Sequence, residues 1–326
     1  MQAIVVKRHG GAEVLEYLAV PDASAPDKVM VELHFAGVNF VDIYQREGRY
    51  PGVSLPLRLG IEGSGIVRQA PSDSEWRSGD RVAFCTGTSG AYAEQLAVAP
   101  EHLVRVPDEL SLKTAAAVLE QGLTAMVLAD DVMFVGTSIA LVHAAAGGVG
   151  GLLTQILLAK GLRVLGTVST QAKAEWLVAR GAEPILYSDS NADWLAEVRA
   201  KTADVGVDVV FDSVGRTTID ASFEALSPRA QLVLFGSASG QVPAVEIAKL
   251  MRKSATLIRP VMPHFLPDAE TLRRHAARLF ERIANSELVV RVHAVLPLAH
   301  AAVAHELLSG RGTQGKLLLK PNGAEL

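Results

Sequence analysis

The segment His143–Gly151, which reads HAAAGGVGG, constrains the fold more than any other part of the sequence. Residues 138–143 before it are apolar and predict a strand, and residues 148–160 predict a helix. Glycines between a strand and a helix let the backbone approach a pyrophosphate, and the helix N-terminus favours the anion. The segment therefore predicts a dinucleotide-binding loop.

The loop departs from the usual G-x-G-x-x-G fingerprint at one position, because Ala145 stands where the first glycine is expected. Alanine can follow the tight turn there if its backbone stays at negative φ. Around the loop, predicted strands and helices alternate through residues 138–236, which is the pattern of a doubly wound α/β domain. The context thus supports dinucleotide binding despite the alanine.

The end of the second predicted strand indicates which dinucleotide binds. An NAD-binding protein usually carries Asp or Glu there, to accept a hydrogen bond from the adenosine ribose. This chain has Thr167, Val168, Ser169 and Thr170, so no carboxylate is present to repel a 2′-phosphate. Lys173 follows one helical turn later and can pair with that phosphate. The sequence therefore favours NADPH, although Lys173 could equally be an ordinary solvated helix residue.

The composition indicates a protein that acts on small molecules in a reducing compartment. The 326 residues carry a formal net charge of −4 with a pI near 6.2, which disfavours nucleic acid and anionic membrane as partners. Cys85 is the only cysteine, and the N-terminus lacks a signal-peptide core. The uncharged stretch 132–159 is long enough to span a bilayer, but its glycines divide it into a strand and a helix. We expect a soluble cytoplasmic protein.

No catalytic metal is expected. The nine histidines do not cluster, and His300 and His305, five apart on a predicted helix, do not share the face that a ligand pair needs.

The spacing of possible catalytic residues excludes two other enzyme classes. No tyrosine has a lysine four residues later, as in short-chain reductases, and no serine lies in a G-x-S-x-G elbow.

The remainder of the chain predicts a second, β-rich domain. Residues 1 to about 120 read as short strands broken by turn signals, which indicates a partly closed antiparallel β domain. Ser111 is placed to cap a helix over 113–120, and a second helix is predicted over 123–131. A predicted strand near 255–259, a helix over 268–286 and strands over 289–295 and 316–319 follow. Those after 260 are too few for a third domain and are expected to complete the first.

Ordered motifs along the whole chain resemble the zinc-free quinone oxidoreductases of the medium-chain dehydrogenase/reductase superfamily, the group of zeta-crystallin. They read HGGAEVL (9–15), GVNFVDIYQREGRYP (37–51), GIEGSGIV (60–67), SGDRVAF (78–84), GAYAE (90–94), QGLTA (121–125), HAAAGGVG (143–150), FDSVG (211–215), FGSASG (235–240) and RGTQGK (311–316). Alanine at position 145 is the usual variant in that family. The resemblance implies an α/β protein with a GroES-like β-rich catalytic domain, 1–121 and 260–326, and a doubly wound Rossmann domain, 122–259.

The resemblance also implies roles for individual residues. Asn39, Tyr44 and Tyr50 would be catalytic and lie near the nicotinamide. The expected cofactor-binding residues are Thr124, Gly147, Gly148, Val149, Ser169, Lys173, Tyr187, Ser213, Phe235, Gly236, Ser237 and Arg311. Three of these have simpler explanations: Asn39 could cap a helix, Tyr50 could pack before Pro51, and Ser213 could cap a turn.

The expected reaction is hydride transfer from NADPH to a quinone or another electron-poor acceptor in a cleft between the two domains, with no metal. Because a quinone is already electrophilic, alignment and hydrogen-bond donors suffice. Two alternatives stay open, an NADPH-dependent alkenal or enoyl reductase and a non-enzymatic or moonlighting single-stranded RNA-binding protein. A homodimer is the family expectation, with the apolar segment 255–258 as a possible sheet edge.

Overall fold

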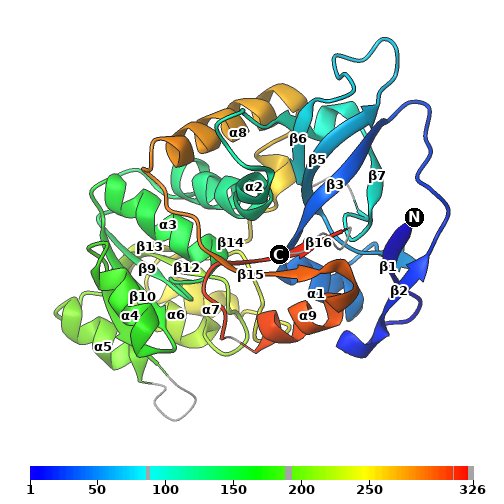
Figure 1. Cartoon of the computed structure of the whole chain (residues 1–326). Helices are drawn as coiled ribbons and strands as arrows, with labels where there is room; N and C mark the ends of the chain where they lie inside the picture. Colours follow the sequence, from blue (N-terminus) through cyan, green and yellow to red (C-terminus); the bar gives the residue numbers. More distant parts are fainter. Residues whose placement is uncertain (86–88, 188–192, 311, 322–326) are drawn as a thin grey trace. The chain divides into compact units, whose positions relative to one another are not determined.

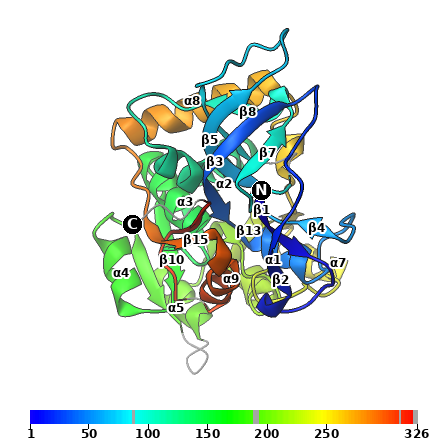
Figure 2. The same ribbon diagram turned by 45° about the vertical axis from the view of Figure 1, so that its right-hand side comes forward.

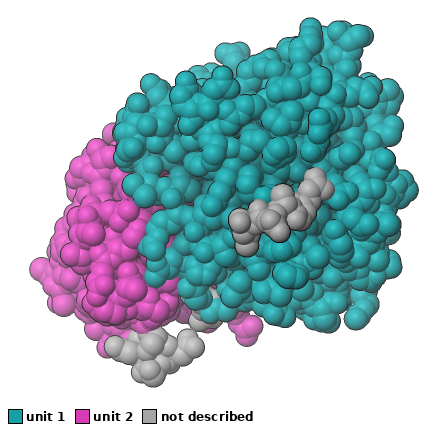
Figure 3. All heavy atoms as spheres, in the orientation of Figure 1, with its two compact units in different colours: residues 1–123, 266–326 teal, residues 124–265 magenta. Residues whose placement is uncertain are grey.

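A computed structural model describes residues 1–85, 89–187, 193–310 and 312–321. The chain forms two compact units (Figure 3). Unit 1 combines Met1–Leu123 with Leu266–Leu326, and unit 2 is Thr124–Phe265.

Unit 2 is built on a six-stranded parallel sheet with the spatial order β11-β10-β9-β12-β13-β14 (Figure 1). The central strands are buried, as expected when helices cover both faces of a parallel sheet. The order reverses between β9 and β12, and at such a point open α/β sheets bind their ligands. The predicted doubly wound fold class is thus confirmed. The strands are β9 (Ile139–Val142), β10 (Arg163–Val168), β11 (Glu183–Leu186), β12 (Val207–Asp212), β13 (Leu226–Leu234) and β14 (Thr256–Ile258).

Short connections join these strands to the helices of unit 2. The apolar stretch 132–159 forms strand β9 and helix α3, with the glycine loop between them. Thr170 caps the N-terminus of helix α4, since its hydroxyl oxygen accepts a hydrogen bond from the backbone N–H of Lys173. The helices are α3 (Gly148–Ala159), α4 (Gln171–Val178), α5 (Trp194–Lys201), α6 (Ile219–Ala225) and α7 (Ile247–Met251), with a π-helical turn η3 (Leu128–Val132) and a 3₁₀ turn η4 (Met262–His264).

Unit 1 contains two sheets. The larger has the order β15-β16-β3-β5-β6-β8, with β7 also paired to β3, and the smaller has the order β2-β1-β4 (Figures 1 and 2). Helix α9 packs on β15 and β16. The strands are β1 (Gln2–Val6), β2 (Leu15–Ala19), β3 (Val29–Val38), β4 (Leu57–Arg58), β5 (Glu62–Gln69), β6 (Arg81–Cys85), β7 (Gln95–Val98), β8 (Leu103–Arg105), β15 (Val292–Pro297) and β16 (Lys316–Lys320). The helices are α1 (Phe40–Arg46), α2 (Leu112–Val127), α8 (Ala269–Ala284) and α9 (Ala301–Ser309), with 3₁₀ turns η1 (Ala12–Val14), η2 (Pro100–His102) and η5 (Leu298–His300).

Helix α2 corrects the prediction of two separate helices. Ser111 caps it as expected, since its hydroxyl accepts a hydrogen bond from the Thr114 N–H (3.0 Å). The helix then continues through Gly122 instead of ending there. A Cβ at Gly122 would lie 2.6 Å from a methyl group of Leu279 on α8, so this glycine allows two helices to pack closely. The stretch Leu112–Val132 is long and apolar enough to cross a membrane, but 72% of its apolar window is buried inside the protein.

Candidate active site

The carboxyl edge of the parallel sheet gathers most of the predicted cofactor-binding residues. Successive parallel strands end at the same edge, so the loops after them are neighbours. Gly147, Gly148 and Val149 follow β9, Ser169 follows β10, Tyr187 follows β11, Ser213 follows β12, and Phe235, Gly236 and Ser237 follow β13. Thr124 lies in α2 with its side chain buried. Arg311 lies outside the described residues.

The glycine loop has the geometry of an anion-binding turn. Gly147 occupies the N-cap of α3 and has extended backbone, so the first N–H groups of the helix have no partners within the helix. Gly150 lies against the turn itself: a Cβ there would be 2.3 Å from the carbonyl oxygen of Ala144. The loop can therefore offer backbone N–H groups and the positive end of the helix dipole to a phosphate.

Ala145 fits the first fingerprint position for two reasons. The left-handed conformation falls on its neighbour Ala144, at φ 51°, and Ala145 is not among the residues with positive φ. The methyl group of Ala145 also faces Gly166 on β10, where a Cβ would lie only 2.7 Å from the Cβ of Ala145. A glycine at position 166 on β10 thus leaves room for the methyl group of the alanine at position 145.

Lys173 and Ser169 lie together at the end of β10. The Lys173 Nζ donates to the Ser169 hydroxyl oxygen (3.3 Å), and the lysine is only 7% exposed. Burial lowers the pKa of the Lys173 ammonium. A buried cation with an exposed serine beside it suits an anionic ligand group, because an added negative charge would favour the ammonium form.

His143, which sequence analysis did not select, connects strand β10 with helix α6 through hydrogen bonds. Its Nδ1 lies 3.1 Å from the Thr167 hydroxyl, and its Nε2 lies 3.1 Å from the Ser222 hydroxyl. Ser222 donates its only hydroxyl hydrogen to Asp212 (3.0 Å), so the histidine must donate through Nε2. Burial lowers the pKa of His143, which keeps the ring neutral.

Asp212 completes this network and shapes the loop that carries Ser213. Its Oδ1 accepts hydrogen bonds from the backbone N–H groups of Val214 (2.8 Å) and Gly215 (2.9 Å), and the Thr218 hydroxyl donates to both carboxylate oxygens. Thr167 in turn accepts a hydrogen bond from the Ala144 N–H (3.2 Å). One buried network thus fixes the turns after β9, β10 and β12. The motif FDSVG contained this aspartate, although its partners could not be identified from sequence.

In unit 1, the three predicted catalytic residues lie on α1 and the loop after it. Asn39 occupies the N-cap of α1 and is 5% exposed, whereas Tyr50 is 43% exposed. Tyr44 lies between them on the helix, and the Arg49 guanidinium stacks 4.7 Å from the centre of its ring. Helix α1 and its flanking residues therefore carry the buried Asn39 amide and two partly exposed phenol groups.

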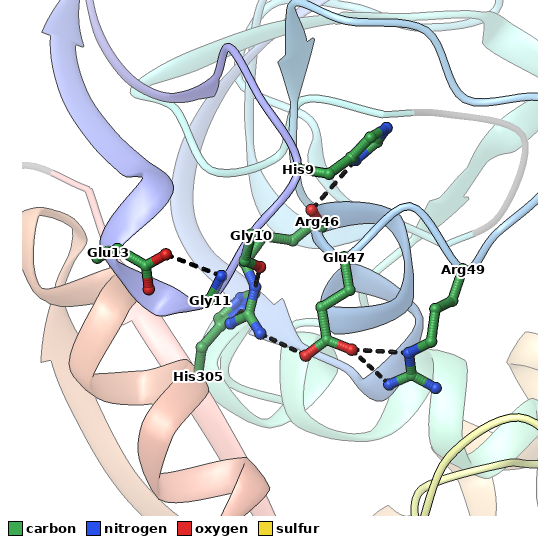
Figure 4. A network of polar contacts seen from close by, with 8 residues as sticks. All are labelled: His9, Gly10, Gly11, Glu13, Arg46, Glu47, Arg49 and His305. Atoms are coloured by element: carbon green, nitrogen blue, oxygen red, sulfur yellow. Dashed lines mark hydrogen bonds and ion pairs between the residues drawn. The ribbon is translucent and has the colours of Figure 1, made fainter.

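Arg46 fastens the end of α1 to the N-terminal segment (Figure 4). Its Nε donates to the Gly10 carbonyl oxygen (3.1 Å), and its Nη2 pairs with Glu47 (2.7 Å). Glu47 also pairs with Arg49 (2.6 Å), while the His9 ring lies 3.2 Å from the Arg46 carbonyl oxygen. These contacts hold the turn that precedes Tyr50.

A buried chain of hydrogen bonds connects α9 to Asn39. Arg46 donates to His305 Nδ1 (3.1 Å), so His305 donates through Nε2 to the Tyr92 oxygen (3.2 Å). The Tyr92 hydroxyl donates to Asp42 Oδ2 (2.9 Å), which also accepts from the backbone N–H of Asn39 (2.8 Å). Burial and the Arg46 charge lower the pKa of His305 to about 3.

The pKa of Asp42 moves in the opposite direction. Burial raises it to about 7, against the lowering effect of the hydrogen bonds from Asn39 and Tyr92. Asp42 Oδ1 has no hydrogen-bond partner within the described ranges. A carboxyl group with one oxygen bonded and one desolvated favours its neutral form.

Glu62 and Lys316 complete the surroundings of Asn39 and were also missed. Both are fully buried charged residues, and both contact the Asn39 side chain. They lie in the quoted motifs GIEGSGIV and RGTQGK, where a charged residue beside an apolar strand was the available signal.

The donor set does not fit a metal ion. Within the described residues, no group of three or more His, Cys, Asp and Glu side chains is placed to hold one. Cys85 is buried, and burial, with Glu62 nearby, raises the pKa of its thiol well above the ordinary value, which disfavours the thiolate that a metal requires.

Comparisons with known proteins match both units. Residues 25–108 match the alcohol dehydrogenase GroES-like domain, and residues 148–281 match the zinc-binding dehydrogenase family. A quinone oxidoreductase of Pseudomonas aeruginosa is 39% identical, over 96% of this chain and 97% of its own length. The chain is also similar to the structure of Escherichia coli quinone oxidoreductase complexed with NADPH, with a TM-score of 0.93 and 35% identity over 98% of this chain and 100% of that one. A 2-haloacrylate reductase of Burkholderia is 31% identical, over 98% of this chain and 99% of its own length.

Proposed function

Because this chain belongs to the quinone oxidoreductase family of the medium-chain dehydrogenase/reductase superfamily, we propose that it reduces quinones with hydride from NADPH. The observation that carries the cofactor choice is Lys173, buried beside Ser169 at the end of β10, where an NAD-binding protein usually has a carboxylate. The E. coli relative was solved with NADPH bound, which agrees with this choice.

The described residues fit such a cofactor. The turn at Gly147, Gly148 and Val149 would hold the pyrophosphate, and Lys173 with Ser169 would hold the 2′-phosphate. NADPH supplies the hydride when it is bound. Further contacts to the cofactor come from Thr124, Tyr187, Ser213, Phe235, Gly236, Ser237 and, outside the described residues, Arg311.

Asn39, Tyr44 and Tyr50 provide the substrate side of the site. The Asn39 amide and the Tyr50 hydroxyl donate hydrogen bonds where negative charge develops on the acceptor oxygen. Solvent supplies the final proton, because a phenolate-like product needs no dedicated acid. These three residues belong to a catalytic domain of residues 1–121 and 260–326, and the Rossmann domain is 122–259.

The reaction proceeds without a metal. A quinone is electrophilic enough that orientation and hydrogen bonding replace Lewis-acid activation. The lack of a clustered donor set within the described residues supports this proposal.

A second candidate is an NADPH-dependent reductase of conjugated alkenals or enoyl compounds. The similarity to a 2-haloacrylate reductase favours it, since that name describes an activated alkene as the substrate. Both reactions place hydride on an electron-poor carbon conjugated to a carbonyl group, so the same site suits either.

The protein acts as a soluble cytoplasmic homodimer on small molecules, without membrane or nucleic-acid partners. Strand β14 lies at the edge of its sheet and is paired only to β13 within the described residues, so a second copy can add its own edge strand there. The net charge of −4 disfavours single-stranded RNA as a ligand. An NADPH-sensitive RNA mobility shift at physiological salt would instead support the RNA-binding alternative.

One experiment tests the function directly. NADPH and NADH are titrated by fluorescence, and the NADPH complex is then mixed in a stopped-flow instrument with a panel of quinones and a medium-chain enone. We expect tighter binding of NADPH and faster oxidation by quinones. Preferential turnover of the enone would support the second candidate, and no oxidation by either class would refute both.

A further inference from the structure

Lys316 is a charged residue at the start of an apolar strand, and it is buried. It precedes Leu317–Leu319 on β16 and is 1% exposed. Its Nζ lies 2.6 Å from Glu62 Oε2 and 2.6 Å from Asn39 Oδ1. Removing two charges from water is costly, and such a pair often stabilises a fold no better than apolar residues would. Its presence therefore calls for a role other than stability.

The ion pair crosses strand β3, which lies between β16 and β5. Gly37 on β3 makes this crossing possible. A Cβ there would lie 2.1 Å from Glu62 Oε2 and 2.9 Å from Lys316 Cε. The second oxygen of Glu62 accepts the backbone N–H of Glu120 on α2 (2.7 Å), which fixes the carboxylate. Three strands and a helix thus hold one buried pair.

This pair dictates how the Asn39 amide is turned. An ammonium group only donates hydrogen bonds, so the Asn39 oxygen must face Lys316. A carboxylate only accepts them, so the Asn39 nitrogen must face Glu62, at 3.0 Å. Both partners specify the same orientation, and the reverse orientation would place like groups together on both sides. The Asn39 backbone is held as well, by the hydrogen bond to Asp42.

The amide nitrogen retains a second N–H. Within the described ranges its only hydrogen bond is the one to Glu62, whereas an amide nitrogen carries two hydrogens. That hydrogen is available to an oxygen atom of a ligand. A donor held in place before the reaction needs no reorganisation as charge develops, which makes it effective in catalysis.

We propose that Lys316 and Glu62 are positioning residues that hold the Asn39 amide so that its free N–H donates to the acceptor carbonyl oxygen. The proposal rests on the proposed function, because it takes Asn39 as a residue that contacts the acceptor. Gly37 is required because the two positioning side chains meet over it.

The double variant Lys316→Met/Glu62→Gln separates positioning from stability, because it removes both buried charges together. In this variant the amide introduced at position 62 can donate to the Asn39 oxygen, which reverses the Asn39 amide and withdraws its N–H. The matched control is Lys7→Met/Glu16→Gln, the same change at an exposed ion pair of unit 1 (2.8 Å). Thermal unfolding of both variants checks that they fold.

The first readout requires neither bound cofactor nor enzyme activity. The side-chain ¹⁵N–¹H resonances of Asn39, identified by their loss in Asn39→Ala, report how the amide is bonded. We expect them to move in Lys316→Met/Glu62→Gln and to stay in place in the control. Unchanged chemical shifts of the Asn39 resonances in the double variant would overturn the proposal, whichever substrate the enzyme reduces.

The second readout is kinetic. We expect the double variant to lower kcat for a quinone roughly tenfold or more, with the NADPH dissociation constant unchanged. On an Asn39→Ala background the same double change should alter kcat by less than about twofold, because positioning residues act through Asn39. An equal loss of kcat on both backgrounds would overturn the proposal. Failure of the proposed function would show separately, as a wild-type protein that oxidises no NADPH with any acceptor.

Discussion

Ala145 and Gly166 fit against each other in unit 2, since a Cβ at position 166 would lie 2.7 Å from the Cβ of Ala145. The fingerprint loop thus carries its alanine only because the next strand carries a glycine. We expect Gly166→Ala to lower the free energy of unfolding by about 1–3 kcal/mol through overpacking and to weaken NADPH binding. Urea unfolding and fluorescence titration measure the two effects.

The compensating change provides the control. Adding Ala145→Gly to Gly166→Ala moves the methyl group from the loop to strand β10 and should restore most of the lost stability. A Cβ at position 166 would also approach a methyl group of the buried Leu177 (2.7 Å), and that side chain must shift equally in both variants. A double variant as unstable as Gly166→Ala would show that the two positions are not complementary.

Lys173→Ala tests the choice of cofactor. A hydrogen bond to a charged group contributes about 1.5–3 kcal/mol, so we expect NADPH to bind roughly 10- to 100-fold more weakly. NADH lacks the 2′-phosphate, and its affinity should barely change. Fluorescence titrations with both nucleotides give the comparison. Lys249→Ala, which removes a half-buried lysine paired with Asp220, is the control, and equal losses for both nucleotides in Lys173→Ala would contradict the phosphate role.

Tyr50→Phe separates orientation from acid catalysis. Tyr50 is 43% exposed, and the product can take its proton from solvent. We therefore expect kcat for a quinone to fall by no more than about tenfold, with NADPH affinity unchanged. Tyr17→Phe, at a tyrosine that is 44% exposed on β2, serves as the matched control. A fall of kcat by several orders of magnitude in Tyr50→Phe would instead make Tyr50 an essential acid.

Local patterns in the sequence were sufficient for the fold class and for the dinucleotide loop. A strand, a glycine turn and a helix are adjacent in the chain, so His143–Gly151 specifies its own geometry. The same local reasoning fails for α2, where it predicts two helices on either side of Gly122 and the structure has one. Its glycine instead serves a contact with Leu279 on another helix, and no neighbour in sequence indicates that partner.

The buried networks could not be predicted because their members are far apart in sequence. Lys316 and Glu62 are separated by 254 positions and meet only once β16, β3 and β5 are in register. Asn39 was selected by resemblance, but its N-cap position alone did not show that its side chain contacts this pair. His143 likewise looks like one more residue of an apolar strand until Thr167 and Ser222 are placed beside it.

Asp42 should make unit 1 less stable as the pH rises. Its pKa of about 7 in the folded protein exceeds that of an unfolded aspartate, near 3.9, so the folded state binds more protons between those values. The free energy of unfolding therefore falls as the pH rises through this interval, by up to about 4 kcal/mol.

Asp42→Asn keeps an oxygen for the Asn39 N–H and the Tyr92 hydroxyl and cannot ionise. Relative to the wild type, this variant should gain stability from about pH 4 to about pH 7 in urea titrations, and the difference should level off above that range. The exposed Asp108→Asn should show no such trend, and a difference between Asp42→Asn and wild type that stays constant with pH would mean that Asp42 is ionised throughout. His305 acts in the opposite sense, since its lowered pKa costs stability as the pH falls below about 6.5, but it contributes equally to both proteins and cancels in their difference.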